Sequence, residues 1–226
     1  MPARSDTDRP AGPPFRFYGR RRGKRPSRRQ EELLESLLPQ LGPDPARLPE
    51  GTLWLEIGAG GGEHLCAQAA KNPDVTLIGC EPFLEGVAKT LATVEEQELG
   101  NVRLHAEDAR PFLEALPEAS IERCFLLFPD PWPKLRHHKR RFVNPANLDR
   151  LARVIRPGGQ FRIATDHMDY ARWILPRMLA HPAFEWTAER ADDWRCPPAD
   201  HVTTRYQQKA EEKGDWPLFF DFLRGA

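Results

Sequence analysis

Long apolar segments are missing from this chain of 226 residues. No stretch approaches the roughly 18 consecutive apolar residues that a transmembrane helix requires. The first ten residues, MPARSDTDRP, lack the apolar core of a secretory signal. We therefore expect neither a membrane protein nor a secreted one. The length suits one domain with extensions, long enough to bury a sizeable core.

Cysteine is scarce and scattered. The four cysteines are Cys66, Cys80, Cys124 and Cys196, and no two of them form a C-x-x-C pair. Paired spacings are typical of structural metal sites and of disulfide-rich secreted domains. We therefore expect no metal site and no disulfide framework, and a reducing cytoplasm is the simplest setting for the chain.

An excess of one charge is also missing, because 33 basic side chains balance 33 acidic ones. Their distribution, however, is uneven. Arg16 to Arg29 contains only cations among its charged residues, and Lys134 to Arg141 forms a second basic run. Charge acts over only about 8 Å at physiological salt, so local clusters decide whether phosphate is bound. The distribution therefore leaves RNA binding open despite the zero total.

The chain divides into three parts. Residues 1–30 are rich in Pro, Gly and Arg, which is typical of a disordered tail. Residues 31–50 contain a helix, because leucines recur at helical spacing between Gln30 and Leu41, followed by a Pro-rich connector. Residues 51–226 are predicted to form the main domain.

Strands and helices alternate through the main domain. Strands are expected at Thr52–Ile57, Val75–Cys80, Val102–Ala106, Ile121–Phe128, Gln160–Thr165, Phe184–Arg190 and Leu218–Leu223. Helices are expected at Gly62–Lys71, Leu84–Glu98, Pro111–Leu116, Asn144–Ile155 and Tyr170–Ala180. This alternation predicts an α/β fold of the Rossmann-like class, with a mostly parallel, seven-stranded sheet and helices on both faces.

A glycine-rich turn, LEIGAGGG, joins the first strand to the first helix of this domain. Gly58 and Gly60 leave room for backbone N–H groups to approach a ligand at the helix N-terminus. Glu81 closes the second strand and can accept hydrogen bonds from both hydroxyls of an adenosine ribose. Asp108 follows the third strand, where it can reach an adenine amino group.

Glu56 lies just before this turn and helps to identify the ligand. A carboxylate there suits a ligand with an amino group and repels a pyrophosphate. The acids therefore favour S-adenosylmethionine over NAD and form the pattern of class I methyltransferases that use it. The alternative for Glu56 is a buried acid satisfied by the protein itself.

The run FPDPWPKLRHHKRRF, from Phe128 to Phe142, follows the fourth strand. It combines Asp130 and Trp132 with three prolines and a dense basic cluster. A carboxylate can accept hydrogen bonds from the Watson–Crick edge of guanine, and an indole can stack on a base or anchor the loop. The cations suit phosphates, although a charge run is more often a solvated face. Their contiguity with Asp130 favours RNA.

These motifs together resemble a known family, the bacterial tRNA (guanine-N7-)-methyltransferases, which modify guanosine 46 in the variable loop. The resemblance spans about residues 50–223. It rests on LEIGAGGG, on G-C-E-P at Gly79–Pro82, on FPDPWPKLRHHKRR, on A-T-D at Ala164–Asp166 and on T-R-Y-Q-Q-K at Thr204–Lys209.

This resemblance implies S-adenosylmethionine as cofactor, tRNA as partner and no obligate protein partner. The cofactor would be held by Glu56, Gly58, Gly60, Glu81, Asp108 and Asp130, with Asp130 also catalytic. The target nucleotide would be contacted by Lys134, Asp166, Thr204, Arg205, Tyr206 and Gln207. RNA would be bound by Arg136, His137, His138, Lys139, Arg140 and Arg141.

One departure from the family pattern is visible. The family usually has T-x-[YF]-E near the C-terminus, and this chain has Gln207 where the acid would stand. Two other functions stay open. An exocyclic-amine methyltransferase would carry [DNS]-P-P-[YFW], whereas this chain has P-D-P-W. A non-catalytic RNA-binding module would not need the cofactor acids.

Overall fold

The computed structural model describes residues 15, 17–19, 21, 23, 25–203, 207–208, 212, 214 and 216–226. The strands are β1 (Thr52–Ile57), β2 (Val75–Cys80), β3 (Val102–His105), β4 (Ile121–Leu127), β5 (Ile155–Thr165), β6 (Phe184–Trp186) and β7 (Leu218–Arg224). The helices are α1 (Arg28–Ser36), α2 (Leu38–Leu41), α3 (Glu63–Lys71), α4 (Leu84–Glu96), α5 (Ala109–Ala115), α6 (Pro145–Val154), α7 (Met168–Ala180) and α8 (Asp192–Arg195), with a 3₁₀ helix, η1, at Leu135–Arg140.

The described strands form one seven-stranded sheet in the order β3-β2-β1-β4-β5-β7-β6. The first five pair in parallel, and β7 runs antiparallel to both β5 and β6. The predicted fold class is confirmed. The order of the strands reverses between β1 and β4, and in such sheets ligands bind beyond the carboxyl ends of the strands at that point.

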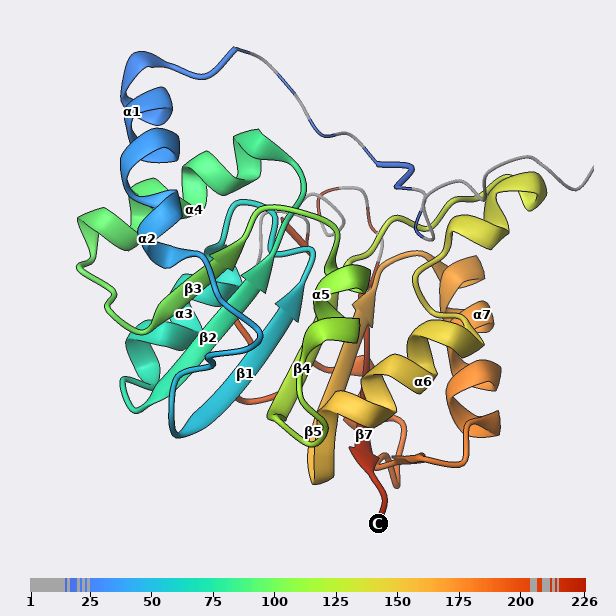
Figure 1. Cartoon of the computed structure of the whole chain (residues 1–226). Coiled ribbons are helices and arrows are strands. Elements are labelled where there is room, and N and C mark those ends of the chain that lie inside the picture. Colours follow the sequence, from blue (N-terminus) through green and yellow to red (C-terminus); the bar gives the residue numbers. More distant parts are fainter. Residues whose placement is uncertain are drawn as a thin grey trace, which may run out of the picture.

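Helices cover both faces of the sheet (Figure 1). On one face, α5, α6 and α7 bury a core that includes Leu55, Phe161 and Ile174. On the other face, α1, α3 and α4 pack over a second core that includes Leu77 and Phe219. Because the central parallel strands are covered on both sides, their sequences are almost continuously apolar.

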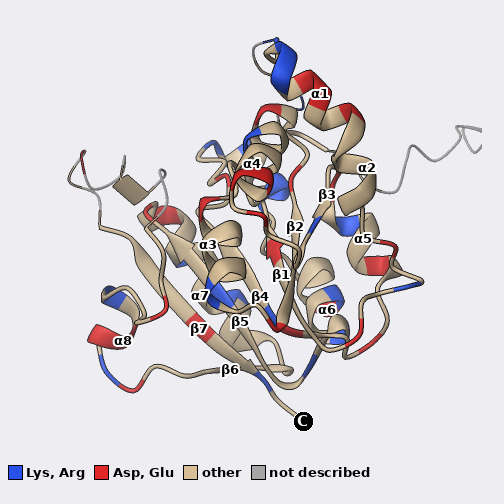
Figure 2. Ribbon diagram, turned by 90° about the vertical axis from the view of Figure 1, so that its left-hand side faces the viewer, with Lys and Arg blue, Asp and Glu red and all other residues tan. Residues whose placement is uncertain are grey.

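The N-terminal helix begins two residues earlier than predicted. Ser27 and Gln30 form a reciprocal capping box that fixes its start. The predicted single helix is divided at Leu37, and α2 has Pro39 in its first turn. Proline cannot donate the backbone hydrogen bond that a continuous helix would need. The pair of α1 and α4 lies to one side of the domain (Figure 2), where Arg29 pairs with Glu95.

Two other boundaries differ because of backbone geometry. β5 begins at Ile155 rather than Gln160, because Gly158 adopts a φ of 74° and accommodates a register shift against β4. β6 is shorter than predicted, because only Phe184–Trp186 pair with β7. The short elements η1 and α8 were not predicted at all.

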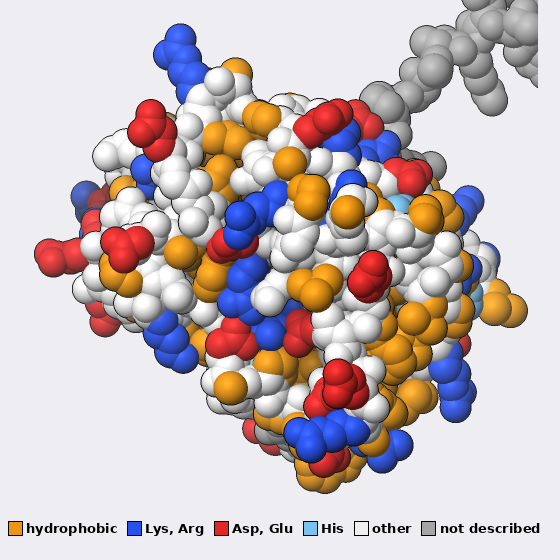
Figure 3. Space-filling model, turned by 90° about the horizontal axis from the view of Figure 1, so that it is seen from below, with side chains coloured by type: hydrophobic (Ala, Val, Ile, Leu, Met, Phe, Trp, Pro, Cys, Tyr) orange, Lys and Arg blue, Asp and Glu red, His pale blue; other side chains and the backbone are white. Residues whose placement is uncertain are grey.

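The surface seen from below in Figure 1 carries cations and anions side by side (Figure 3). An interspersed pattern of this kind produces no extended field of one sign. No helix within the described ranges is long and apolar enough to cross a membrane.

Candidate active site

A cleft of about 630 Å³ opens at the carboxyl ends of the central strands. The glycine turn after β1 lines it together with Glu81, Asp108 and Asp130. The loop after β4 contributes Trp132 and Arg140. The two motifs that the sequence singled out therefore meet in one cavity, at the point where the strand order reverses.

The glycine turn is held by a close approach of α4. A Cβ atom on Gly86 would lie only 2.3 Å from the carbonyl oxygen of Gly60, so only glycine fits at this position in the first turn of α4. Gly60 itself has a φ of 57° and Gly58 a φ of 79°, conformations that favour glycine. Gly58 and Gly60 both line the cleft, and Gly86 is a supporting residue that sequence analysis missed.

Glu81 joins the glycine turn to the second strand. Its carboxylate accepts hydrogen bonds from the backbone N–H groups of Gly60, at 2.7 Å, and Phe83, at 2.8 Å. Burial raises the pKa of the Glu81 carboxyl, although both hydrogen bonds oppose that change. A partly desolvated acceptor at the carboxyl end of β2 is suited to bind ligand hydroxyls.

Asp108 is already engaged with the protein. Its side chain accepts from the backbone N–H of Arg110 at 3.0 Å and caps the start of α5. The guanidinium of Arg110 contacts both carboxylate oxygens. Burial opposes ionisation, but Arg110 outweighs it and lowers the pKa of Asp108. The carboxylate lines the cleft, and a ligand amino group would share it with Arg110.

Glu56 is not among the residues that line the cleft, and its contact with the cofactor stays a prediction. It is 4 % exposed and accepts a hydrogen bond of 2.7 Å from Nδ1 of His64 on α3. The other ring nitrogen of His64 accepts from Gln68 at 3.3 Å, which assigns the proton to Nδ1. Glu56 is thus a buried acid satisfied by the protein, and it lies behind the glycine turn rather than in the cavity.

The loop after β4 has an unusual backbone. Phe128 has a φ of 50° and Trp132 a φ of 43°, both rare for residues other than glycine. Such conformations cost about 1–3 kcal/mol each and persist where the surroundings determine them. Asp130 lies between these two residues and lines the cleft. Partial desolvation by the surrounding protein raises the pKa of the Asp130 carboxyl, although the side chain as a whole is exposed.

Trp132 is covered on one face by Arg140. The guanidinium carbon of Arg140 lies 4.8 Å from the Trp132 ring centroid and 4.5 Å from that of Tyr18. Phe17 and Tyr18 also line the cleft, so described residues of the segment expected to be disordered contact the domain. Arg140 is half-buried between two rings, and this environment differs from that of a free surface cation.

Arg141, which the sequence predicted as an RNA contact, is buried. Its side chain is 1 % exposed, and the guanidinium packs on the rings of Tyr170 and Trp173. It donates to the carbonyl oxygen of Pro131 at 2.8 Å and pairs with Asp169. A guanidinium in this position supports the loop from inside.

The other predicted RNA contacts are more accessible. Lys134, Arg136 and Lys139 are exposed, and His137 and His138 are half-buried. Burial and the surrounding cations lower the pKa of His137, so its imidazole binds a proton less readily than a free one. The exposed positive charge of this loop therefore comes from the lysines and Arg136.

The structure covers part of the predicted substrate contacts. Asp166 follows β5 and is half-buried, whereas Thr204, Arg205 and Tyr206 lie outside the described residues. Gln207 is 4 % exposed and its Oε1 contacts Nε2 of His201. The amide that replaces the usual acid is therefore turned into the protein.

Two further cleft residues were missed by sequence analysis. Phe83, two residues after Glu81, provides an apolar wall, and Lys89 on α4 lines the cavity while pairing with Glu85 at 3.0 Å. Phe83 could have been noticed, because an apolar residue after the acid of the second strand would face an adenine. Lys89 gives no such signal in a helix with ordinary amphipathic spacing.

Comparison with known proteins agrees with these features. A family described as a putative methyltransferase matches residues 50–217. A tRNA (guanine-N(7)-)-methyltransferase of a Caulobacter species is 52% identical over 219 residues, covering 93% of this chain and 96% of that protein. The one from Rhodospirillum rubrum is 49% identical over 223 residues, covering 92% and 88%.

The chain belongs to the tRNA (guanine-N(7)-)-methyltransferase family. Among solved structures, the 16S rRNA methyltransferase KamB superposes with a TM-score of 0.56 at 19% identity, covering 90% of this chain and 98% of that one. A 16S rRNA (adenine(1408)-N(1))-methyltransferase gives 0.54 at 13% identity, covering 87% and 92%. At these identities the two structures show the fold alone, and the family assignment comes from the sequence relatives.

Proposed function

We propose that this protein transfers the methyl group of S-adenosylmethionine to N7 of a guanosine in tRNA, at position 46 of the variable loop. One observation carries the proposal most directly. The loop with Asp130 and Trp132 lines the same cleft as the glycine turn and Glu81, so a base and a nucleoside cofactor can meet there. The activity named for the relatives agrees with this arrangement.

The residues around the cleft fit S-adenosylmethionine. Glu81 offers a carboxylate to ribose hydroxyls, Phe83 offers an apolar surface to adenine, and Asp108 lies beside it as an acceptor for the amino group. The turn at Gly58 and Gly60 carries no Cβ that would block a close approach. When bound, the cofactor supplies an electrophilic methyl group on a sulfonium.

The chemistry requires no general base. N7 of guanine carries a lone pair and no proton, so it can form the new N–C bond directly while the S–C bond breaks. The base then gains the positive charge that the sulfonium loses. The protein must hold N7 in line with the methyl carbon, which accounts for much of the rate in reactions of this type.

Asp130 is the residue we assign to catalysis. Its carboxylate lies at the end of β4 in the cleft and can bind the guanine edge while opposing the developing positive charge. Asp166, which follows the neighbouring β5, would act on the same base from the next strand. Trp132 would stack on the base or anchor the loop, and Lys134 would contact the target nucleotide.

The exposed cations Arg136 and Lys139 would bind RNA phosphates, together with His137, His138 and Arg140. Thr204, Arg205 and Tyr206 are proposed substrate contacts on the strength of the family motif alone. Arg141 and Glu56 are both buried among protein partners, so in this proposal Arg141 supports the loop and Glu56 supports the glycine turn from behind. A tRNA substrate also favours the cytoplasm as the place where the enzyme works.

The proposal is tested with the full chain, unmodified tRNA transcript and labelled S-adenosylmethionine. Digestion to nucleosides should give 7-methylguanosine as the labelled product. A matched transcript with adenosine in place of the variable-loop guanosine should take up no label. Label on an exocyclic amine would refute the reaction, and label that persists in the matched transcript would refute the position.

A further inference from the structure

The carboxylate of Asp108 is held by N–H groups that all belong to Arg110. The backbone N–H of Arg110 donates to Oδ1 at 3.0 Å. Its Nε donates to Oδ1 at 3.0 Å and to Oδ2 at 3.1 Å, and its Nη2 donates to Oδ2. A carboxylate offers about four lone-pair positions, so these N–H groups leave about one position, on Oδ2, for a further donor.

This pair forms part of the wall of the cleft. The side chains of Asp108 and Arg110 are only 12 % and 23 % exposed, and both line the cavity, as does Phe83. The guanidinium carbon of Arg110 also lies 5.4 Å from the centroid of the Phe15 ring. Partial burial strengthens the contacts between the two charges. The carboxylate of Asp108 is therefore fixed in one orientation at the edge of the cavity.

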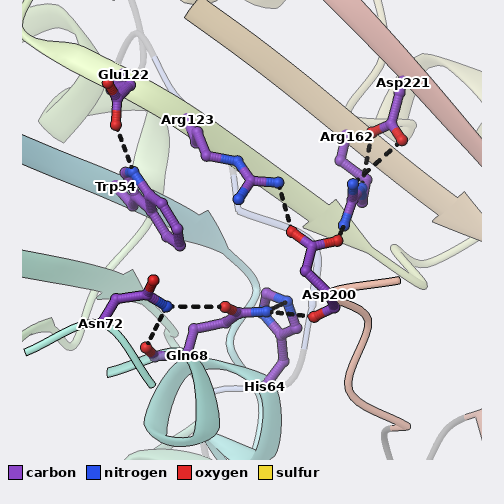
Figure 4. Close-up of polar contacts among 9 residues, drawn as sticks. All are labelled: Trp54, His64, Gln68, Asn72, Glu122, Arg123, Arg162, Asp200 and Asp221. Atoms are coloured by element: carbon purple, nitrogen blue, oxygen red, sulfur yellow. Dashed lines mark hydrogen bonds and ion pairs between the residues drawn. The ribbon is translucent and has the colours of Figure 1, made fainter. Parts of the chain in front are cut away.

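A similar arrangement elsewhere in the domain lacks a cavity beside it. Arg162 of β5 contacts Asp221 of β7 through Nε at 2.7 Å and Nη2 at 3.2 Å, and Asp200 through Nη1 at 2.6 Å (Figure 4). None of these three residues lines the cleft. Their contacts hold neighbouring segments of the fold together. Arg110 makes the same kind of contact, but with a carboxylate that borders the space for the cofactor.

The remaining position on Asp108 suits the amino group of adenine. That group carries two N–H donors, and the apolar ring of Phe83 lines the same cleft for the base itself. An acceptor that is already fixed binds its donor without the cost of ordering it on binding. A site built for a hydrogen bond also rejects a ligand that lacks the donor, because the polar group of the protein then stays unpaired.

We propose that Arg110 is a positioning residue for the cofactor, which fixes Asp108 so that its Oδ2 accepts a hydrogen bond from the adenine amino group. This inference rests on the proposed function, because Asp108 is a cofactor contact of that reaction. Arg110 acts through Asp108. Selection of adenine should therefore depend on Arg110, whereas the contacts with the rest of the cofactor should not.

The test compares two ligands, S-adenosylhomocysteine and its 6-deamino analogue, in which hydrogen replaces the adenine amino group. Calorimetry on the full chain gives both dissociation constants. Wild type should prefer the amino form roughly 10-fold or more, as for a charge-assisted contact. Arg110→Gln should reduce this preference to about threefold or less, because only the amino form loses a fixed partner.

Two results with Arg110→Gln would overturn the inference. An unchanged preference, with or without weaker binding of both ligands, would show that Arg110 only supports the fold. A stronger preference would show that Arg110 competes with adenine for Asp108.

Arg150→Gln is the matched control. Arg150 of α6 contacts Oε1 of Glu114 on α5 through Nε at 3.0 Å and Nη2 at 2.7 Å, and its guanidinium carbon lies 4.9 Å from the Phe15 ring centroid. It does not line the cleft. Arg150→Gln should keep the wild-type preference between the two ligands. If it lowers the preference as much as Arg110→Gln does, general loosening of α5 is sufficient and the inference is overturned.

A second variant keeps the test decisive if Arg110→Gln does not fold. Arg110→Lys keeps the charge beside Asp108, but an ammonium group cannot contact both carboxylate oxygens as a planar fork does. The preference for the amino form should still fall at least about threefold, and a wild-type preference would reject the inference. Wild type without any preference would reject the contact between Asp108 and adenine, and the inference with it. Wild type that shows the preference but does not methylate tRNA would reject the proposed reaction alone.

Discussion

The guanidinium of Arg141 donates a hydrogen bond to the carbonyl oxygen of Pro131, ten residues earlier in the same loop. This contact ties the end of η1 to the stretch between Asp130 and Trp132. Because the same guanidinium packs on the rings of Tyr170 and Trp173, the loop is fixed to α7. Arg141 belongs to a basic run that suggests an RNA-binding surface, but its side chain stabilises the loop from within the protein.

Substitution of Arg141 should affect the loop and not the electrostatic binding of RNA. Arg141→Gln loses the hydrogen bond to Pro131 and the ion pair with Asp169, so we expect a loss of about 1–3 kcal/mol in the free energy of unfolding. The saturated methylation rate should fall, because Asp130 is displaced. The slope of log K against log salt for tRNA binding should stay unchanged.

The exposed cations should show the opposite behaviour. Arg136→Gln and Lys139→Gln remove charges that contact solvent, and each lost phosphate contact should reduce the salt slope by about 0.7–0.9. Stability should change by less than about 0.5 kcal/mol, as is usual for surface substitutions. Filter binding over a series of salt concentrations measures the slope, and urea unfolding measures the stability. A flattened slope in Arg141→Gln would contradict the division of roles.

Asp130→Asn should remove most turnover from a folded protein. Loss of one charge-assisted contact costs about 1.5–3 kcal/mol, which is about 10- to 150-fold in rate. Loss of the opposing charge to the methylated base should add to this. Single-turnover rates at saturating tRNA and cofactor are the measurement, with Asp149→Asn, an exposed acid on α6, as the matched control. Rates within a few-fold of wild type would remove Asp130 from catalysis.

Glu81→Gln should weaken cofactor binding more than it slows chemistry. The carboxylate can bind ribose hydroxyls in both the ground state and the transition state, so its loss should appear in the dissociation constant and in KM for S-adenosylmethionine. We expect an increase of roughly 10-fold or more. Calorimetry with the exposed control Glu118→Gln measures it. Unchanged binding would show that Glu81 only supports the glycine turn through Gly60 and Phe83.

The loss of folding stability at acid pH should come in part from protonation of Asp200. Burial opposes ionisation of its carboxyl, but Arg162 and Arg123 outweigh it and lower the pKa of Asp200 to about 2. An aspartate in an unfolded chain titrates at about 3.9. The folded value is the lower one, so the contribution is fully present above about pH 5 and is lost as the pH falls toward 2.

Between pH 5 and pH 2 the free energy of unfolding should therefore fall more steeply in wild type than in Asp200→Asn. Urea unfolding at intervals across this range measures both slopes, and the two curves should approach each other near pH 2. Parallel curves would show that the carboxyl of Asp200 is not stabilised by the two arginines in the folded state.

Sequence alone predicted the central strands well because their identity depends on local pattern. β1 and β2 are largely apolar runs between turn residues, and their predicted bounds match the structure. α8 was missed because four residues, D-D-W-R, show no periodicity. β5 was shortened because Pro157, Gly158 and Gly159 indicate a turn, whereas the sheet accommodates them within the strand.

The sequence alone indicated which residues line the cleft where that location depends on the end of a strand. Gly58, Gly60, Glu81, Asp108 and Asp130 all line the cleft for that reason. The sequence did not reveal burial where a distant partner determines the environment. The carboxylate of Glu56 forms a hydrogen bond with His64 of the following helix. Arg141 is covered by aromatic rings that lie about thirty residues further along the chain. Neither partnership follows from local spacing.

The position of β7 in the sheet determines when the sheet can be completed during synthesis of the chain. β7 follows β6 in the chain but inserts between β5 and β6, and Phe219, Phe220 and Phe222 close the core on both faces of the sheet. On the ribosome, β5 therefore remains an open edge until residues 218–224 have been synthesised, and Arg162 lacks the carboxylate of Asp221 until then. A chain cut short before Leu218 would expose a long apolar edge strand, which favours aggregation. Completion of the sheet is thus delayed until nearly the whole domain has been translated.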